Sequence, residues 1–208
     1  MMEYARINES ELDIFKNHAR ILISGYSGGG KSWLASKIIK KYSYKFDHII
    51  VLGSNLENVN NLVKRDDSFD PYVEKPEGRI LCIFDDFLFS KPLLQLAAKL
   101  AIDGRHLQIS TLFLSQNLIF NNNFYRIISL NLTGHFLFRT RDQGQISYFG
   151  RTFLSKDKIE SFLNLYKKVV VKKKYCYLFL DFTSDFEEPI SIRSSLFGED
   201  LYEKCYLL

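Results

Sequence analysis

One stretch of eight residues constrains this chain more than any other feature of its sequence. Gly25-Tyr26-Ser27-Gly28-Gly29-Gly30-Lys31-Ser32 matches the pattern G-x-x-x-x-G-K-[ST] at every defined position. The apolar run Arg20–Gly25 before it predicts a short buried strand, and Lys31–Tyr42 after it has apolar residues at helical spacing. A glycine-rich loop between a strand and a helix is the context that this motif requires, which disfavours a match by chance.

The residue types in this loop suit a triphosphate. Glycines let the backbone curl until several N–H groups point at one phosphate, and the following helix adds the positive end of its dipole. Lys31 would place a compact cation against the β- and γ-phosphates, and the Ser32 hydroxyl would ligate Mg²⁺. The sequence therefore predicts that residues Gly25 to Ser32 bind ATP together with Mg²⁺.

The remaining apolar runs indicate the rest of the fold. They predict strands at His48–Ser54, Arg79–Phe87, Ser110–Asn117, His135–Thr140, Tyr175–Phe182 and Ile190–Ile192, and helices at Pro92–Asp103 and Ser155–Lys168. The stretch Asn55–Glu77 is predicted to be mostly loop, with one or two helical turns. Because strands alternate with helices, we expect a three-layer α/β fold of the P-loop NTPase type, with a mainly parallel sheet in RecA-like order. The 208 residues suffice for one such domain, with an arm or helix at 1–18 and a tail at 183–208 that extends the sheet.

Polar side chains end two of the predicted strands. Asp85 and Asp86 end an apolar strand at the carboxyl edge of the sheet, where open α/β sheets place their ligands. Asp85 would hold Mg²⁺ through its water shell, and Asp86 would orient or deprotonate an attacking water. Gln116 would reach the γ-phosphate if its strand lies between the P-loop strand and the acidic strand. The alternatives are a solvated turn for the aspartates and a polar strand cap for Gln116.

The amino-acid composition excludes few of the possible classes of function. The net charge is +4, which is compatible with a polyanionic partner but typical of many proteins that bind none. The chain has no apolar run of about 20 residues, no apolar signal-peptide core and no C-x-x-C pair among its three cysteines. We therefore expect a soluble, intracellular protein without a membrane partner. The basic cluster of Lys167, Lys168 and Lys172–Lys174 is better explained as a solvated surface than as a nucleic-acid site.

A longer stretch points to a particular family. Asp103-Gly104-Arg105-His106-Leu107-Gln108-Ile109-Ser110, running on to Ser115-Gln116-Asn117, resembles a signature of the FtsK/HerA superfamily of DNA-pumping ATPases. The paired Asp85-Asp86 and the sequence pattern "GRH…LSQN" most resemble those of genome-packaging ATPases of the poxvirus type and their relatives in virophages and polinton-like elements. The likeness covers roughly Arg20 to Phe197. Many members have Glu after the magnesium-binding Asp, whereas this chain has Asp86.

This resemblance implies a function and a set of partners. It implies a homo-oligomeric ring, hexameric or pentameric, that hydrolyses ATP and threads double-stranded DNA into a capsid, with capsid proteins as candidate partners at host-cell assembly sites or in the virion. Each ATP would lie at a subunit boundary and receive an arginine from the neighbour. Arg105 is the first choice for that arginine, with Arg139 and Arg141 as rivals. The polar segment Asn117–Arg126 is a candidate DNA-contacting loop in the pore.

Three other classes remain open from the residues alone. They are a P-loop kinase or small-molecule NTPase, a helicase or other nucleic-acid remodeller, and a nucleotide-dependent assembly protein. The sequence shows neither an arginine-rich lid segment, which a kinase would need, nor a second motor domain, which a helicase would need. DNA-stimulated ATPase activity and strand displacement would discriminate among these classes.

Overall fold

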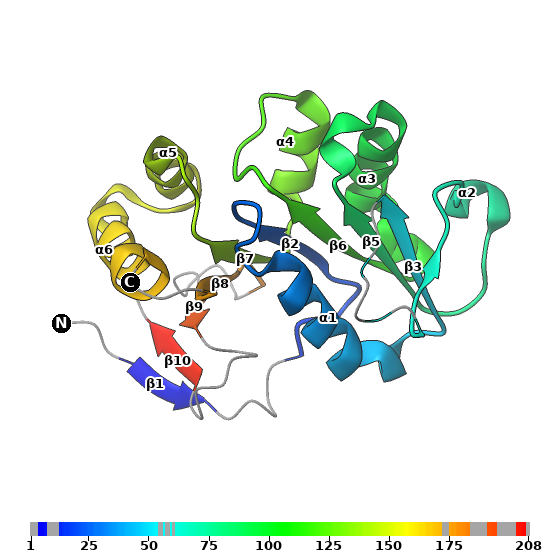
Figure 1. The fold of residues 1–208 in the computed structure, drawn as a ribbon, viewed down its shortest axis with the longest axis horizontal. Helices are drawn as coiled ribbons and strands as arrows, with labels where there is room; N and C mark the ends of the chain where they lie inside the picture. The colour runs from blue at the N-terminus through cyan, green and yellow to red at the C-terminus, as the bar shows by residue number, and fades with distance from the viewer. Residues whose placement is uncertain are drawn as a thin grey trace.

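The computed structural model of the protein describes residues 4–7, 13–53, 56, 59, 61–171, 175–183, 191–194 and 203–206. In this part of the chain ten strands form a single sheet with helices on both faces (Figure 1). The strands are β1 (Tyr4–Ile7), β2 (Arg20–Ser24), β3 (His48–Gly53), β4 (Lys64–Arg65), β5 (Ile80–Asp85), β6 (Ile109–Ser115), β7 (Gly134–Phe138), β8 (Tyr177–Asp181), β9 (Ser191–Ser194) and β10 (Glu203–Tyr206). The main helices are α1 (Lys31–Tyr42), α2 (Pro71–Glu74), α3 (Lys91–Asp103), α4 (Asn123–Leu130), α5 (Gln143–Phe153) and α6 (Lys156–Tyr166).

The strand order confirms the predicted RecA-like arrangement. Across the sheet the order is β1-β10-β9-β8-β7-β2-β6-β5-β3-β4. The central strands β7, β2, β6, β5 and β3 run parallel to one another, while β8, β9, β10 and β1 continue the sheet in antiparallel pairs. Because β6 lies between the P-loop strand β2 and the acidic strand β5, the condition set for Gln116 is met.

The core lies on both faces of this sheet, as the near-continuous apolar strands require. Ile21 and Ile23 of β2 pack with α1 on one face, and Leu22 between them packs on the other face with α3 and α4. A third apolar cluster joins α5 and α6 to β7, β8 and β9 on that second face. Figure 1 shows α1 on the opposite side of the sheet from α3 and α4. No helix in the described ranges is long and apolar enough to cross a membrane.

The local structure differs from the predictions in three places. The segment Asn117–Arg126 is not a loop throughout, because α4 begins at Asn123 and buries Tyr125 and Ile128. The Asn122 side chain caps this helix by accepting a hydrogen bond from the Phe124 N–H at 2.8 Å. The helix α5 was not predicted, and the N-terminal segment contains the strand β1, which pairs with β10. Residues Lys172–Lys174 of the basic cluster lie outside the described residues.

Candidate nucleotide-binding site

The glycine-rich loop connects β2 directly to α1, as its motif predicts. Its glycines Gly28 and Gly30 have φ angles of 77° and 104°, a backbone region that side chains with a Cβ adopt at a cost. The loop is anchored at both sides of β2: the Gly25 N–H donates to the Ser115 carbonyl and the Tyr26 N–H donates to the Arg139 carbonyl, each at 3.1 Å. The first two residues of the loop are therefore tied to the strands on both sides of β2.

Lys31 is held inside this loop. Its Nζ donates hydrogen bonds to the carbonyl oxygens of Gly25 at 2.9 Å and Tyr26 at 3.1 Å. Burial lowers the pKa of Lys31, and the negative charges of Asp85 and Asp86 act in the opposite direction. The two aspartates thus favour the charged ammonium that a phosphate ligand requires.

The two aspartates occupy different environments at the end of β5. Asp85 is buried, with only 9% of its surface exposed, and pairs in register with Gly53 of β3. Asp86 is exposed and has a φ of 50°, in the left-handed region. Its Oδ1 accepts a hydrogen bond from Gln116 Nε2 at 3.2 Å. Strand order thus brings a predicted base and a predicted γ-phosphate sensor into direct contact.

A single cavity of about 380 Å³ gathers most of the predicted site residues. Its lining is Ser27, Gly28, Gly30, Lys31, Ser32, Trp33, Asp85, Asp86, Gln116 and Tyr175. Gly25, Tyr26 and Gly29 belong to the loop but do not line the cavity. The cavity therefore combines loop amides, one cation, two carboxylates and an amide, which is the set of groups that binds and polarises a triphosphate.

Two aromatic residues of this cavity were missed by sequence reasoning. Trp33 was counted with the apolar stripe of its helix, yet it is 40% exposed and lines the cavity beside Ser32. Tyr175 lies just before β8 with a φ of 61°, and its ring lies against Gly30. Trp33 directly follows the motif, and that position could have indicated its place in the cavity. Nothing in the sequence connects Tyr175 to Gly30.

Gly53 is a third residue that the sequence did not single out. Its φ is 101°, and a Cβ placed on it would lie 1.9 Å from the carbonyl oxygen of Asp85. Only glycine allows β3 to pass this close to the end of β5. Gly53 therefore helps to set the position of Asp85.

The arginines predicted from the family resemblance lie at opposite edges of the sheet. Arg105 is exposed in the short 3₁₀ turn Gly104–Leu107 that precedes β6, whereas Gln116 follows the end of β6. A seven-residue strand spans about 20 Å, so Arg105 does not reach the cavity of its own chain. Arg139 and Arg141 follow β7 at the carboxyl edge, and the Arg141 guanidinium lies 5.9 Å from the centre of the Tyr26 ring.

The residues present fit a magnesium ion. Ser32 and Asp85 place two oxygen donors on the wall of one cavity, and Mg²⁺ in nucleotide sites is held by one or two such protein groups, with waters and phosphates completing its shell. In the described part of the chain no group of three or more His, Cys, Asp or Glu side chains could form a metal site. Phosphate and water oxygens would therefore have to complete the coordination shell of a metal ion in this cavity.

Comparison with known proteins reveals the same fold. No family model and no curated protein sequence match the chain. The genome packaging NTPase B204 from Sulfolobus turreted icosahedral virus 2, solved with ATP-γ-S, aligns with a TM-score of 0.55 at 17% identity over 85% of this chain and 97% of that one. B204 from Sulfolobus turreted icosahedral virus, described as a DNA-packaging ATPase, gives 0.54 at 20% identity over 84% and 96%.

A bacterial protein shares the fold as part of a longer chain. The cytoplasmic domain of the type VII secretion ATPase EccC from Thermomonospora curvata gives a TM-score of 0.55 at 13% identity, over 83% of this chain and 25% of that one. These likenesses agree with the fold that the FtsK/HerA resemblance implies. The chain thus has the fold of the viral packaging NTPase B204, which it matches over nearly the whole length of that protein.

Proposed function

We propose that this protein is a magnesium-dependent ATPase that drives double-stranded DNA into a viral or virus-like capsid as a ring of subunits. The observation that carries the proposal is the cavity in which Lys31, Asp85 and Asp86 meet a glycine-rich loop. The DNA substrate and the capsid are inferred from the shared fold of B204, a genome packaging NTPase.

The hydrolytic step follows from the groups around the cavity. The N–H groups of the loop and the Lys31 ammonium bind the phosphates, and Ser32 with Asp85 holds the metal. When bound, Mg²⁺ neutralises charge on the β- and γ-phosphate oxygens. Asp86 accepts a hydrogen bond from the attacking water and draws its proton away, while Gln116 keeps the Asp86 carboxylate in place. Both side chains are exposed and can therefore meet water.

A neighbouring subunit completes the site with a positive charge. Arg105 lines a separate cavity of about 430 Å³ at the amino edge of the sheet, together with Arg20. Burial lowers the pKa of Arg20, and the nearby positive charge of Arg105 lowers it further. The cavity is also lined by Asp13 and Asp181, but Arg105 is exposed and its guanidinium can meet an anion such as the γ-phosphate of an adjacent subunit. This placement supports Arg105 as the arginine donated in trans.

Turnover with and without long double-stranded DNA, combined with a mass measurement of the assembly, tests the proposal. We expect DNA to stimulate ATP hydrolysis, and the active assembly to contain five or six subunits. If DNA leaves the rate of ATP hydrolysis unchanged, the proposed ATPase activity would stand and the proposed DNA translocation would not. Displacement of one strand from a partial duplex would instead indicate a helicase.

The nucleotide site itself is tested by Lys31→Ala. The substitution should weaken ATP–Mg²⁺ binding by about 100-fold, because hydrogen bonds to charged groups contribute about 1.5–3 kcal/mol each. Trp33 is the single tryptophan of the chain and lines the cavity, so its fluorescence reports nucleotide binding directly. Lys40→Ala, on the exposed side of the last turn of α1, is the matched control and should bind normally. Unchanged affinity in Lys31→Ala would remove the phosphate-binding role of the loop.

A further inference from the structure

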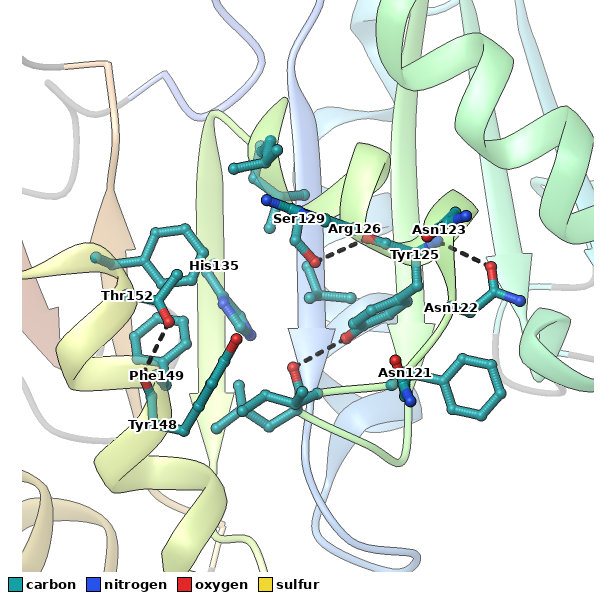
Figure 2. Close-up of a pocket in the computed structure, with 17 residues that line it drawn as sticks. Asn121, Asn122, Asn123, Tyr125, Arg126, Ser129, His135, Tyr148, Phe149 and Thr152 are labelled. Carbon is teal, nitrogen blue, oxygen red and sulfur yellow. Dashed lines mark hydrogen bonds between the residues drawn. The ribbon is translucent and has the colours of Figure 1, made fainter.

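A second and larger cavity lies on the face of the sheet opposite α1. It is bounded by α4, α5 and the strands β2 and β7, and its volume is about 550 Å³ (Figure 2). Volumes of this size are typical of ligand sites. Its lining shares no residue with the nucleotide cavity, so it is a separate site.

A buried histidine forms part of the wall of this cavity. His135 is 1% exposed, and its Nε2 lies 2.7 Å from the Ser24 hydroxyl, while its Nδ1 has no hydrogen-bond partner among the described residues. Figure 2 shows the imidazole projecting from β7 into the space between α5 and α4. Burial lowers the pKa of His135 to about 3, so the ring is neutral at neutral pH.

The Ser24 contact is compatible with either neutral tautomer of the His135 ring. If Ser24 donates to Nε2, Nδ1 carries an N–H that has no partner among the described residues. If Nε2 donates to Ser24 instead, Nδ1 carries a lone pair that has no partner among them. In both cases the cavity presents a buried ring nitrogen that a hydroxyl, which can donate or accept, would satisfy.

The other residues that line the cavity indicate the chemistry of its ligand. The walls combine apolar and polar side chains in similar measure, and the apolar ones include Leu22, Leu118, Leu132, Phe149 and Phe153. At the rim, Leu130 and Tyr148 are 66% and 59% exposed, so the apolar surface continues beyond the cavity. Arg126 is the only charged residue among those that line the cavity, and Asn121 and Asn123 add exposed amides.

We propose that this cavity binds a short acidic peptide segment of a partner protein through an inserted tyrosine. The tyrosine ring packs between the apolar side chains of the cavity, and its hydroxyl forms a hydrogen bond with Nδ1 of His135. Arg126 pairs with an acidic residue beside the tyrosine, and Asn121 and Asn123 bond to the peptide backbone. A free small molecule inside the cavity would leave Leu130 and Tyr148 uncovered, which favours a peptide.

Two peptides that differ by one hydroxyl group test the proposal. Calorimetric titrations would compare Ac-Asp-Asp-Tyr-Asp-Asp-NH₂ with the same peptide carrying Phe, and with a third carrying Ala. The Tyr peptide should bind about 3- to 10-fold more tightly than the Phe peptide, as one neutral hydrogen bond predicts. The Ala peptide should bind most weakly. Equal affinity of the Tyr and Phe peptides, or no binding of either at millimolar concentration, would overturn the proposal.

Variants of the protein locate the effect. In His135→Phe the preference for Tyr over Phe should disappear, whatever the change in overall affinity, because the ring nitrogen that bonds to the hydroxyl is gone. Ser129→Phe, which fills the cavity from α4, should abolish binding of both peptides while nucleotide binding stays normal. Arg126→Gln should weaken the binding of both peptides equally. Arg151→Gln, on α5 and outside the cavity, should weaken the binding of neither. A Tyr preference that persists in His135→Phe would place the peptide elsewhere.

Discussion

The two edges of the parallel sheet carry different parts of the proposed catalytic machinery. At the carboxyl edge, Lys31, Asp86 and Gln116 gather around the nucleotide cavity, while at the amino edge Arg20 and Arg105 lie together around another. The strand β6 connects the two edges, with Arg105 before it and Gln116 after it. On the proposed function, one chain holds two half-sites about 20 Å apart, which a single subunit cannot bring together. The comparison teaches that full activity would need a second copy of the chain.

Substitution of Arg105 at the amino edge should distinguish the roles of the two half-sites most clearly. Arg105→Ala should reduce turnover of the assembled protein by about 10³- to 10⁵-fold, the range known for arginines donated to a γ-phosphate. Nucleotide affinity of the single chain, read from Trp33 fluorescence, should stay nearly normal because Arg105 does not line that cavity. Arg79→Ala, which removes a nearby arginine outside the amino-edge cavity, is the control and should retain turnover.

Mixing subunits tests whether Arg105 acts across a boundary. A Lys31→Ala subunit keeps its arginine and an Arg105→Ala subunit keeps its loop, so mixtures should recover part of the activity. No recovery at any ratio would contradict action in trans. Normal turnover in Arg105→Ala with loss in Arg141→Ala would move the role to the carboxyl edge, where Arg141 lies beside Tyr26.

A smaller loss of turnover should follow a change of one atom at the carboxyl edge. Asp86→Asn should reduce turnover by about 10²- to 10⁴-fold, the usual contribution of a general base, and leave ATP–Mg²⁺ binding intact. Asn tolerates the left-handed backbone of this position, so the fold should persist. Single-turnover hydrolysis measures the effect, and Asp86→Glu, with the longer acid that many family members have, should restore most of it. Near-normal turnover in Asp86→Asn would reassign the base.

The sequence was sufficient where the signal is local. The glycine-rich loop, the helix Lys31–Tyr42 and the apolar strand ending in Asp85 each depend on contiguous residues, and all three are confirmed. The pairing of β1 with β10 joins residues from the two ends of the chain, so no local pattern could indicate it. The helix α4 begins at the last of three consecutive asparagines, and its sequence looked like a loop because its stability comes from burying Tyr125 and Ile128 against other elements.

The candidate site divides in the same way. The motif predicted the loop, and strand ends predicted Asp86 and Gln116, but their hydrogen bond depends on the strand order of the folded sheet. Tyr175 reaches the cavity from a distant segment, and Gly53 matters only because β3 lies against β5. Contacts made in three dimensions were therefore beyond the reach of sequence patterns.

Gly53→Ala tests whether the position of Asp85 depends on such a contact. The added Cβ would lie 1.9 Å from the Asp85 carbonyl oxygen, at a backbone φ of 101° that alanine adopts only with strain. We expect the thermal midpoint to fall by roughly 4–12 °C, because strain of about 2–3 kcal/mol shifts a domain of this size by that much. The Mg²⁺ concentration needed for ATP binding should also rise, since Asp85 must move.

Gly78→Ala provides the matched control for this change. Gly78 has a similar φ of 88°, but the atom that its Cβ would approach, at 2.6 Å, belongs to the flexible carboxylate of Asp47. That side chain can rotate away at the cost of the hydrogen bond that its Oδ2 accepts from the Arg79 N–H, whereas the backbone of β5 cannot move aside. Gly78→Ala should therefore lose less stability and leave the Mg²⁺ requirement unchanged. If the two variants lost equal stability and neither altered the Mg²⁺ requirement, backbone strain alone would explain Gly53. The approach of β3 to Asp85 would then have no part in the metal site, and the carboxyl edge would depend on its own strand ends only.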